Sequence, residues 1–142
     1  MSRSSQTIRH YRDLEVWQVG IDLVLAAYEL SNAFPVDERY GLTAQLRRAA
    51  VSVPANIAEG HGRRHTGDYV RHLSIANGSL LELETHVHLA VRLGYASQKA
   101  VDEVWGLAAR VGQMLARLIA RLELKRLRPR SPGPRVPGPG PR

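Results

Sequence analysis

Arginine is the residue type whose number and spacing in this chain suggest a binding function. Five arginines lie close together in the sequence together with three histidines: Arg47, Arg48, Arg63, Arg64, Arg71, His61, His65 and His72. Guanidinium groups neutralise phosphates, release counterions and stack on nucleic-acid bases. Three more basic residues, Lys125, Arg126 and Arg128, open the C-terminal segment. These eight basic residues predict contacts with RNA or another nucleic acid.

A second interpretation of the same arginines is structural. Residues 13–38 contain six acidic residues and no basic one, whereas residues 39–72 contain six arginines against Glu59 and Asp68. Such segregation also predicts ion pairs between the acidic first helix and the arginines, within one subunit or between subunits.

The net charge of +7 is spread unevenly along the chain. Residues 125–142 have six basic residues and no acid, and residues 1–12 have three basic residues and no acid. The segment between them has 11 basic and 13 acidic residues, so the body of the protein is slightly acidic. The high isoelectric point therefore describes the two ends of the chain more than its core.

No catalytic or metal-binding constellation emerges from the remaining polar residues. The chain has no cysteine, which excludes disulfides, thiolate zinc sites and cysteine nucleophiles. His86 and His88 are two residues apart and fall on different faces of a helix, so they cannot bind one metal ion together. The remaining plausible helical pair is Asp68 and His72, which is too few ligands for a metal site. We expect no enzyme activity, no metal and no cofactor.

Ser52, Asn56 and Glu59 form a conspicuous polar group near Pro54, but no histidine or lysine in that stretch is placed to activate a nucleophile. We expect these side chains to cap the backbone groups that Pro54 leaves free, including the Ala50 carbonyl, and to hydrogen bond to a neighbouring helix.

The elements that position these residues are predicted to be helices throughout residues 13–127. Residues 1–12 are predicted to be a flexible arm, without the apolar stretch of a secretory signal. Residues 129–142 contain six prolines and three glycines, and we expect residues 128–142 to form a disordered tail. No apolar run approaches transmembrane length, so the expected location is the cytoplasm.

The first predicted helix begins after an N-cap at Asp13, ends near Phe34 and is apolar on two faces. One stripe contains Leu14, Trp17, Ile21, Val24 and Tyr28; the other contains Val16, Val19, Leu23, Ala26 and Leu30. A helix with two apolar faces needs two apolar neighbours. One stripe can face the bundle core, and the other needs another part of the core or another subunit. Val16, Val19, Leu23 and Leu30 are the candidates for a contact between subunits.

The second predicted helix covers residues 40–60, and Pro54 within it predicts a kink. The third begins at a Thr66 cap and stops at Gly94. The fourth begins after Ser97 and carries Val101, Ala108, Leu115 and Leu122 at a seven-residue spacing. Together they predict an all-α, antiparallel, up-down-up-down four-helix bundle. A three-helix fold would require a complete break at Pro54.

Three stretches resemble a known family: DLEVWQ at residues 13–18, RYGLTAQLRRAAVSVPANIAEG at residues 39–60 and ELETHVHLAVRLGY at residues 82–95. They are similar to the four-helix-bundle proteins encoded in intervening sequences of bacterial large-subunit ribosomal RNA genes. The resemblance covers roughly residues 11–124. The chain departs from the family in its proline-rich tail and in having arginine for 18 of its 20 basic residues.

The resemblance implies a ring-forming homopentamer without established enzymatic activity. It also implies similarity to the accessory protein of diversity-generating retroelements, which partners a reverse transcriptase and binds nucleic acid. We therefore expect a non-enzymatic homo-oligomer that binds RNA or DNA through its arginines. The alternative is a scaffold that docks a protein partner without contacting nucleic acid.

Overall fold

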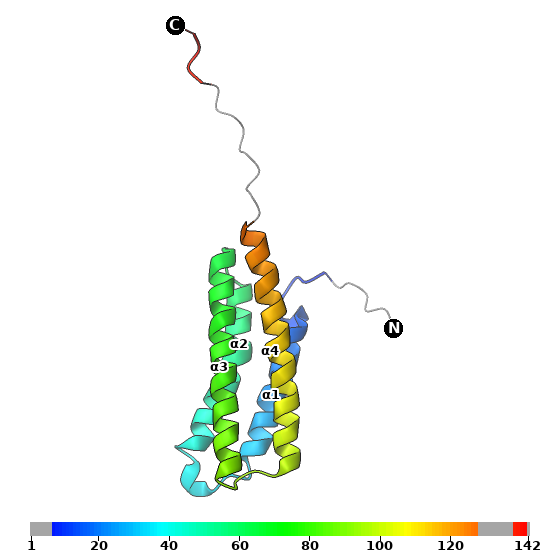
Figure 1. Cartoon of the computed structure of the whole chain (residues 1–142), viewed down its shortest axis with the longest axis vertical. Helices are drawn as coiled ribbons and strands as arrows, with labels where there is room; N and C mark the ends of the chain where they lie inside the picture. Colours follow the sequence, from blue (N-terminus) through cyan, green and yellow to red (C-terminus); the bar gives the residue numbers. More distant parts are fainter. Residues whose placement is uncertain (1–6, 128–137, 142) are drawn as a thin grey trace, which may run out of the picture.

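The computed structural model describes residues 7–127 and 138–141 and is built from helices (Figure 1). A short 3-10 helix, η1 (Tyr11–Asp13), precedes α1 (Glu15–Ser31), and a second, η2 (Val36–Glu38), precedes α2 (Leu42–His61). The two longest helices follow, α3 (Thr66–Arg92) and α4 (Gln98–Leu127). No strand occurs in the described residues, so the prediction of an all-α chain with four main helices is confirmed.

The four helices pack around one apolar core. Each helix lies beside its neighbours in the chain and α4 also lies beside α1, whereas the backbones of the diagonal pairs are farther apart within the described residues. The side chains with the least exposure include Leu23, Leu46, Leu73, Leu83 and Leu115. On α4 the predicted seven-residue spacing correctly identified Val101, Ala108 and Leu115 as buried positions.

The helix ends differ from the sequence prediction in two places. Asp13 does not cap α1: its carboxylate accepts hydrogen bonds from the backbone N–H groups of Arg9 and His10 and closes η1. Thr66 is the first residue of α3 rather than its cap. Ser97 does cap α4, because its hydroxyl accepts from the Ala100 N–H at 3.3 Å.

Pro54 lies inside α2, and the helix continues through it without a break. The three-helix alternative is therefore wrong. A Cβ added at Gly20 of α1 would stand 3.4 Å from the Pro54 Cβ, close to an ordinary van der Waals contact. The backbones of α1 and α2 therefore lie close together at these two residues.

The polar residues around Pro54 serve the packing of α2 against α3. The Asn56 amide donates to the Ser52 carbonyl at 2.8 Å, and not to the Ala50 carbonyl that Pro54 leaves without its usual donor. The Ser52 and Ser79 hydroxyls are 2.8 Å apart and hydrogen bond across the two helices. The predicted hydrogen bond to a neighbouring helix is therefore present as the Ser52–Ser79 bond. The predicted capping of the Ala50 carbonyl by these side chains is not observed.

The stripe of α1 that was predicted to contact another subunit lies in the chain's own core. Val16, Val19, Leu23 and Leu30 are between 0% and 5% exposed in a single chain, so they belong to its own core. Their assignment to a subunit contact is wrong, because a side chain already covered by α2 and α4 cannot also meet another subunit. Tyr28, on the other stripe, is 40% exposed.

Burial along α4 fades toward its C-terminal end. Val111 and Leu115 are fully buried, whereas Leu118 and Leu122, which continue the same stripe, are partly exposed. Figure 1 shows the reason: α1 begins well short of the end of the bundle where α4 finishes. At that end of the bundle, α2, α3 and α4 pack together without α1.

Candidate nucleic-acid interface

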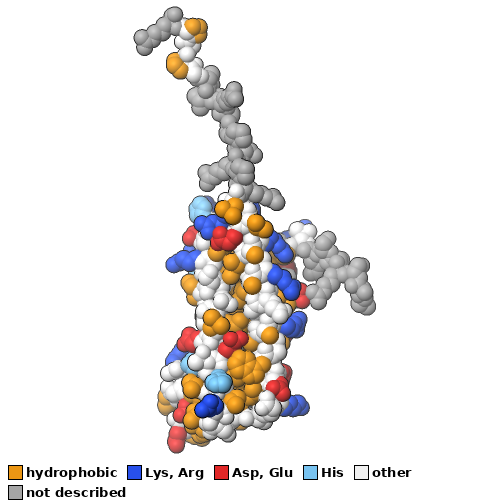
Figure 2. Space-filling model, viewed as in Figure 1, with side chains coloured by type: hydrophobic (Ala, Val, Ile, Leu, Met, Phe, Trp, Pro, Cys, Tyr) orange, Lys and Arg blue, Asp and Glu red, His pale blue; other side chains and the backbone are white. Residues whose placement is uncertain are grey.

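α2 finishes, α3 begins and α4 finishes at the same end of the bundle (Figure 1), and basic residues lie in all three segments. Arg63 and Arg64 lie in the four-residue link between α2 and α3, and Arg71 lies on the second turn of α3. Lys125 and Arg126 lie in the last turn of α4. In Figure 2 several lysine and arginine side chains surround this end.

The contact between α4 and α3 fixes the relative position of these residues. The Arg126 guanidinium lies near Gly67, where an added Cβ would stand 3.6 Å from Nη2. Arg126 also donates to the Glu123 carboxylate, Nη1 to Oε1, at 3.3 Å. The end of α4 therefore lies beside the start of α3, which brings two separate sequence segments into one region.

We define the basic end as Arg63, Arg64, Arg71, Lys125 and Arg126. All five side chains are exposed. Apart from Arg126, none forms a hydrogen bond or an ion pair with the residues that the structure describes. Exposed guanidinium and ammonium groups without internal partners are available to neutralise phosphates.

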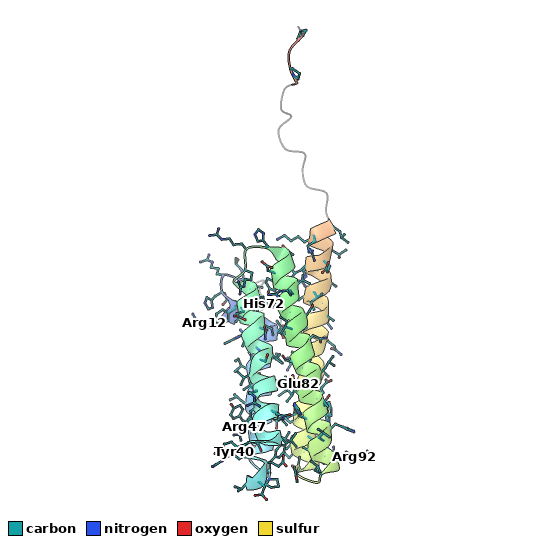
Figure 3. All side chains as sticks on the ribbon, turned by 90° about the vertical axis from the view of Figure 1, so that its left-hand side faces the viewer. Arg12, Tyr40, Arg47, His72, Glu82 and Arg92 are labelled. Carbon is teal, nitrogen blue, oxygen red and sulfur yellow. The ribbon has the colours of Figure 1, made fainter. Side chains whose placement is uncertain are left out.

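The structure adds basic residues that were not among the sequence candidates. Arg12 of η1 lies in the same half of the molecule as His72 (Figure 3). Arg117 and Arg121 precede Lys125 at four-residue intervals on α4, and all three are exposed. That spacing places them on one face of a helix, and it was the signal that could have identified them from the sequence.

Arg47 and Arg48 do not belong to the basic end. Figure 3 shows Arg47 in the opposite half of the bundle from Arg12 and His72. The Arg47 side chain is anchored: Nε donates to the Ser31 hydroxyl at 2.8 Å, Nη2 donates to the Asn32 Oδ1 at 3.0 Å, and the guanidinium lies 4.6 Å from the Tyr28 ring centre. Arg47 joins α2 to the end of α1. Arg48 is exposed and lacks a partner in the described part of the chain.

The buried histidine near the basic end has partners other than the one predicted. His72 is 6% exposed, and its Nδ1 lies 3.4 Å from the Asn56 Oδ1 and 3.7 Å from the Glu59 Oε2. It does not pair with Asp68 within the described residues. Neighbouring Tyr69 is half-buried, and burial raises the pKa of its phenol. Within residues 7–127 and 138–141, no three acidic or histidine side chains gather into a metal site.

The acidic residues predicted to pair with the arginine cluster include Glu15 of α1, and the arginine of that cluster that contacts the end of α1 is Arg47. Glu15 of α1 lies 3.9 Å from Arg110 of α4, and Arg47 binds hydroxyl and amide groups instead of a carboxylate. Arg128, the remaining sequence candidate, lies outside the described residues, as do residues 1–6 of the predicted arm and most of the predicted tail.

A protein-family model covers most of the helical bundle. A model of the 23S rRNA-intervening sequence protein family matches residues 12–117. The chain belongs to this family. Arg63, Arg64 and Arg71 fall inside the matched family region, whereas Lys125 and Arg126 follow it. No curated protein matches the sequence.

A solved structure supports the fold of this intervening sequence protein. A crystallised protein of unknown function from the S23 ribosomal protein family of Bacteroides thetaiotaomicron VPI-5482 superposes with a TM-score of 0.68 at 19% sequence identity. The match covers 73% of this chain and 97% of the other. None of the described helices is both long and apolar enough to cross a membrane.

Proposed function

We propose that the protein is a non-enzymatic, cytoplasmic homo-oligomer that binds RNA or another nucleic acid through the basic end. The observation that carries the proposal is the meeting of Arg63, Arg64 and Arg71 with Lys125 at one end, all exposed and without internal partners. Such groups gain affinity by releasing counterions from phosphates, so binding would depend on charge more than on sequence. No cofactor is required.

The proposed assembly is a ring, a pentamer by family resemblance, of antiparallel up-down-up-down bundles. The contacts of Gly67 with Arg126 and of Gly60 with His72 support this order of helices. Closed symmetry would repeat the basic end once per subunit and multiply weak phosphate contacts. Because the Leu23 stripe is buried in each chain, self-association must use another apolar surface.

The outer face of α3 and α4 offers such a surface. Leu81 is 54% and Leu89 is 45% exposed, and with Trp105 they line a shallow cavity of about 350 Å³. Hydrophobic side chains run along this face in Figure 2. The same feature supports the alternative function, a scaffold that docks a protein partner through apolar contacts.

Nucleic-acid binding is tested by fluorescence anisotropy with short labelled RNA and DNA at several salt concentrations. The double substitution Arg63→Gln/Arg64→Gln should weaken binding and reduce the slope of log affinity against log salt by about 1.5 to 2. The control is Arg92→Gln/Lys99→Gln, which removes the same charge from exposed positions outside the basic end. It should retain the wild-type slope.

Light scattering on the same samples gives the mass of the assembly. An oligomer whose nucleic-acid affinity falls only in the Arg63/Arg64 variant supports the proposal. Equal losses in both variants would mean that net charge alone drives binding. An oligomer that ignores nucleic acid at low salt would reject this function and favour the scaffold.

A further inference from the structure

A cavity lies away from the basic end, where α1 finishes and α2 begins. It measures about 390 Å³, is open to solvent on one side, and is lined by the end of α1, η2 and the first turns of α2. Its polar lining comes from Ser31, Asn32, Arg39, Thr43 and Arg47. Figure 3 shows Arg47 and Tyr40 together in this part of the molecule.

One guanidinium in the cavity wall is held in place before any ligand arrives. Arg47 is fixed by the Ser31 hydroxyl, the Asn32 amide oxygen and the Tyr28 ring. These contacts use Nε and Nη2 and leave the Nη1 donors without a partner in the described residues. A positive group with a fixed geometry loses little side-chain entropy when it binds an anion.

Arg39 supplies a second positive charge to the same cavity. Its side chain is exposed and has no hydrogen bond or ion pair within the described part of the chain. No acidic residue lines the cavity. The carboxylate of Glu38, the residue before Arg39, binds the start of α2, because its Oε2 accepts the Leu42 N–H at 2.9 Å. Two cations therefore face the cavity without a carboxylate in its wall.

Thr43 adds a hydroxyl group to the cavity wall. The residue is 9% exposed and lines the cavity, and its hydroxyl forms no hydrogen bond with the described residues. The hydroxyl oxygen is not among the fully buried atoms without a partner, so the small exposed part of this side chain includes the hydroxyl. A ligand in the cavity can therefore bond to it.

The start of α2 adds backbone donors to this group. Only the Leu42 N–H is capped, by Glu38, whereas the N–H groups of Thr43 and Ala44 have no acceptor among the described residues. Unpaired N–H groups and the helix dipole together favour an anion at a helix N-terminus. These donors belong to two residues that line the same cavity.

We propose that this cavity binds a phosphate monoester. The two backbone N–H groups, the Thr43 hydroxyl, Arg39 and the free Nη1 of Arg47 exceed the number of donors that the two oxygens of a carboxylate satisfy, and they suit the three terminal oxygens of a phosphate. Phe34 and Val36 line the apolar part of the cavity, where the organic group of the ester would lie. This site is separate from the basic end and does not depend on the function proposed for it.

Isothermal titration calorimetry with phenyl phosphate tests the site, with inorganic phosphate as a competitor. Phenyl phosphate supplies both the terminal phosphate and an apolar body. Saturable binding in the millimolar range or tighter is expected, and Arg39→Gln should weaken it about tenfold, the effect of losing one charge-assisted hydrogen bond. Thr43→Val, which preserves the shape of the side chain, should weaken it about threefold or more.

The matched control is Arg48→Gln, which removes one positive charge from the same helix outside the cavity lining. It should bind phenyl phosphate within about twofold of the unmodified protein. Thermal unfolding of all three variants checks that they are folded. Absence of saturable binding to the unmodified protein, or unchanged affinity in folded Arg39→Gln, would overturn the proposal. Equal weakening by Arg48→Gln would do the same, because it would show attraction by general charge.

Two sources could provide the monoester, a free small molecule or the terminal phosphate of a nucleic-acid strand. A short RNA with a 5′-phosphate and the same RNA without it distinguish them. A preference for the phosphorylated strand that disappears in Arg39→Gln identifies the strand end as a ligand. Equal binding of both strands, with phenyl phosphate still bound, identifies a small molecule. The double variant Arg63→Gln/Arg64→Gln should leave phenyl phosphate binding unchanged, so failure of the two proposals can be told apart.

Discussion

Gly60 of α2 lies against His72 of α3 so closely that a Cβ added at Gly60 would stand 2.8 Å from the His72 Cβ and 3.2 Å from the Tyr69 carbonyl oxygen. The same approach lets the His72 imidazole lie near Asn56 and Glu59 of α2. A single missing methyl group therefore permits both the helix contact and the polar cluster around His72.

Gly60→Ala should destabilise the protein although alanine is the better helix former. Alanine gains about 1 kcal/mol of helix propensity over glycine, but the clash with the α3 backbone cannot be relieved by a rotamer change. Overpacking costs about 1–3 kcal/mol, so a net loss of stability is expected in urea unfolding. Gly78→Ala is the control, because a Cβ there meets nothing within 4 Å. It should stabilise by about 0.5–1 kcal/mol, and a stabilised Gly60→Ala would contradict the observed packing.

Leu23→Glu should unfold the chain rather than only dissociate an assembly. Leu23 is fully buried, and the substitution both empties its site and places a carboxylate without a partner in the core. Truncating a core leucine alone costs about 2–5 kcal/mol, and the buried charge adds to that. Circular dichroism and urea unfolding measure the loss.

Leu25→Glu provides the matched comparison for Leu23→Glu. Leu25 lies two residues away on α1 and is 64% exposed. The variant should keep the helical content and stability of the unmodified protein to within about 0.5 kcal/mol. If Leu23→Glu instead remained fully helical and only lost mass in light scattering, the burial of the Leu23 stripe within one chain would be incorrect.

The sequence predicted the helices well and the roles of the two α1 faces badly, for related physical reasons. Apolar spacing near 3.6 residues identifies a helix and the positions that some neighbour covers. It does not identify the neighbour. On α1 the stripe of Leu23 and the stripe of Trp17 have the same period, and it is the Leu23 stripe that packs in the bundle's own core.

The basic residues illustrate a second limit of sequence reasoning. Arg47 and Arg63 appeared to belong to one cluster because few residues separate them. An α-helix of that length extends about 24 Å, so α2 places them in opposite halves of the molecule. Conversely, Arg126 is distant from Gly67 in sequence but lies beside it in the bundle. Grouping the arginines by their distance in the sequence identified the residues that carry positive charge, but it did not predict which of them lie at the same end of the bundle.

Arg47→Gln should destabilise the protein, in contrast to the substitution of its neighbour. The variant loses two hydrogen bonds to Ser31 and Asn32 and the contact with the Tyr28 ring. The expected cost is about 1–2 kcal/mol in urea unfolding. Arg48→Gln removes the same charge one residue away, where the side chain has no partner in the described residues, and should change stability by less than about 0.5 kcal/mol. Equal effects would show that charge, and not the Arg47 contacts, determines stability.

Asp13 predicts a pH dependence at the start of the bundle. The backbone N–H groups of Arg9 and His10 donate to its carboxylate at 3.1 and 3.0 Å and lower the pKa of Asp13, since they favour the ionised form. The stabilisation is therefore complete above the ordinary carboxyl pKa of about 4 and is lost as the pH falls through the lowered pKa. The turn it closes also contains Tyr11, whose ring lies 5.2 Å from that of Trp17.

Three measurements check this dependence together. The carboxyl resonance of Asp13 should titrate below the ordinary aspartate range, and Trp17 fluorescence should change over the same acidic interval as Tyr11 is released. Asp13→Asn should speed hydrogen exchange at the Arg9 and His10 amides at neutral pH, because a neutral amide is a weaker acceptor than a carboxylate. Asp22→Asn, on an exposed position of α1, should leave those two amides unchanged. An Asp13 resonance that titrates at the ordinary value would show that the η1 turn does not depend on the charge of this carboxylate.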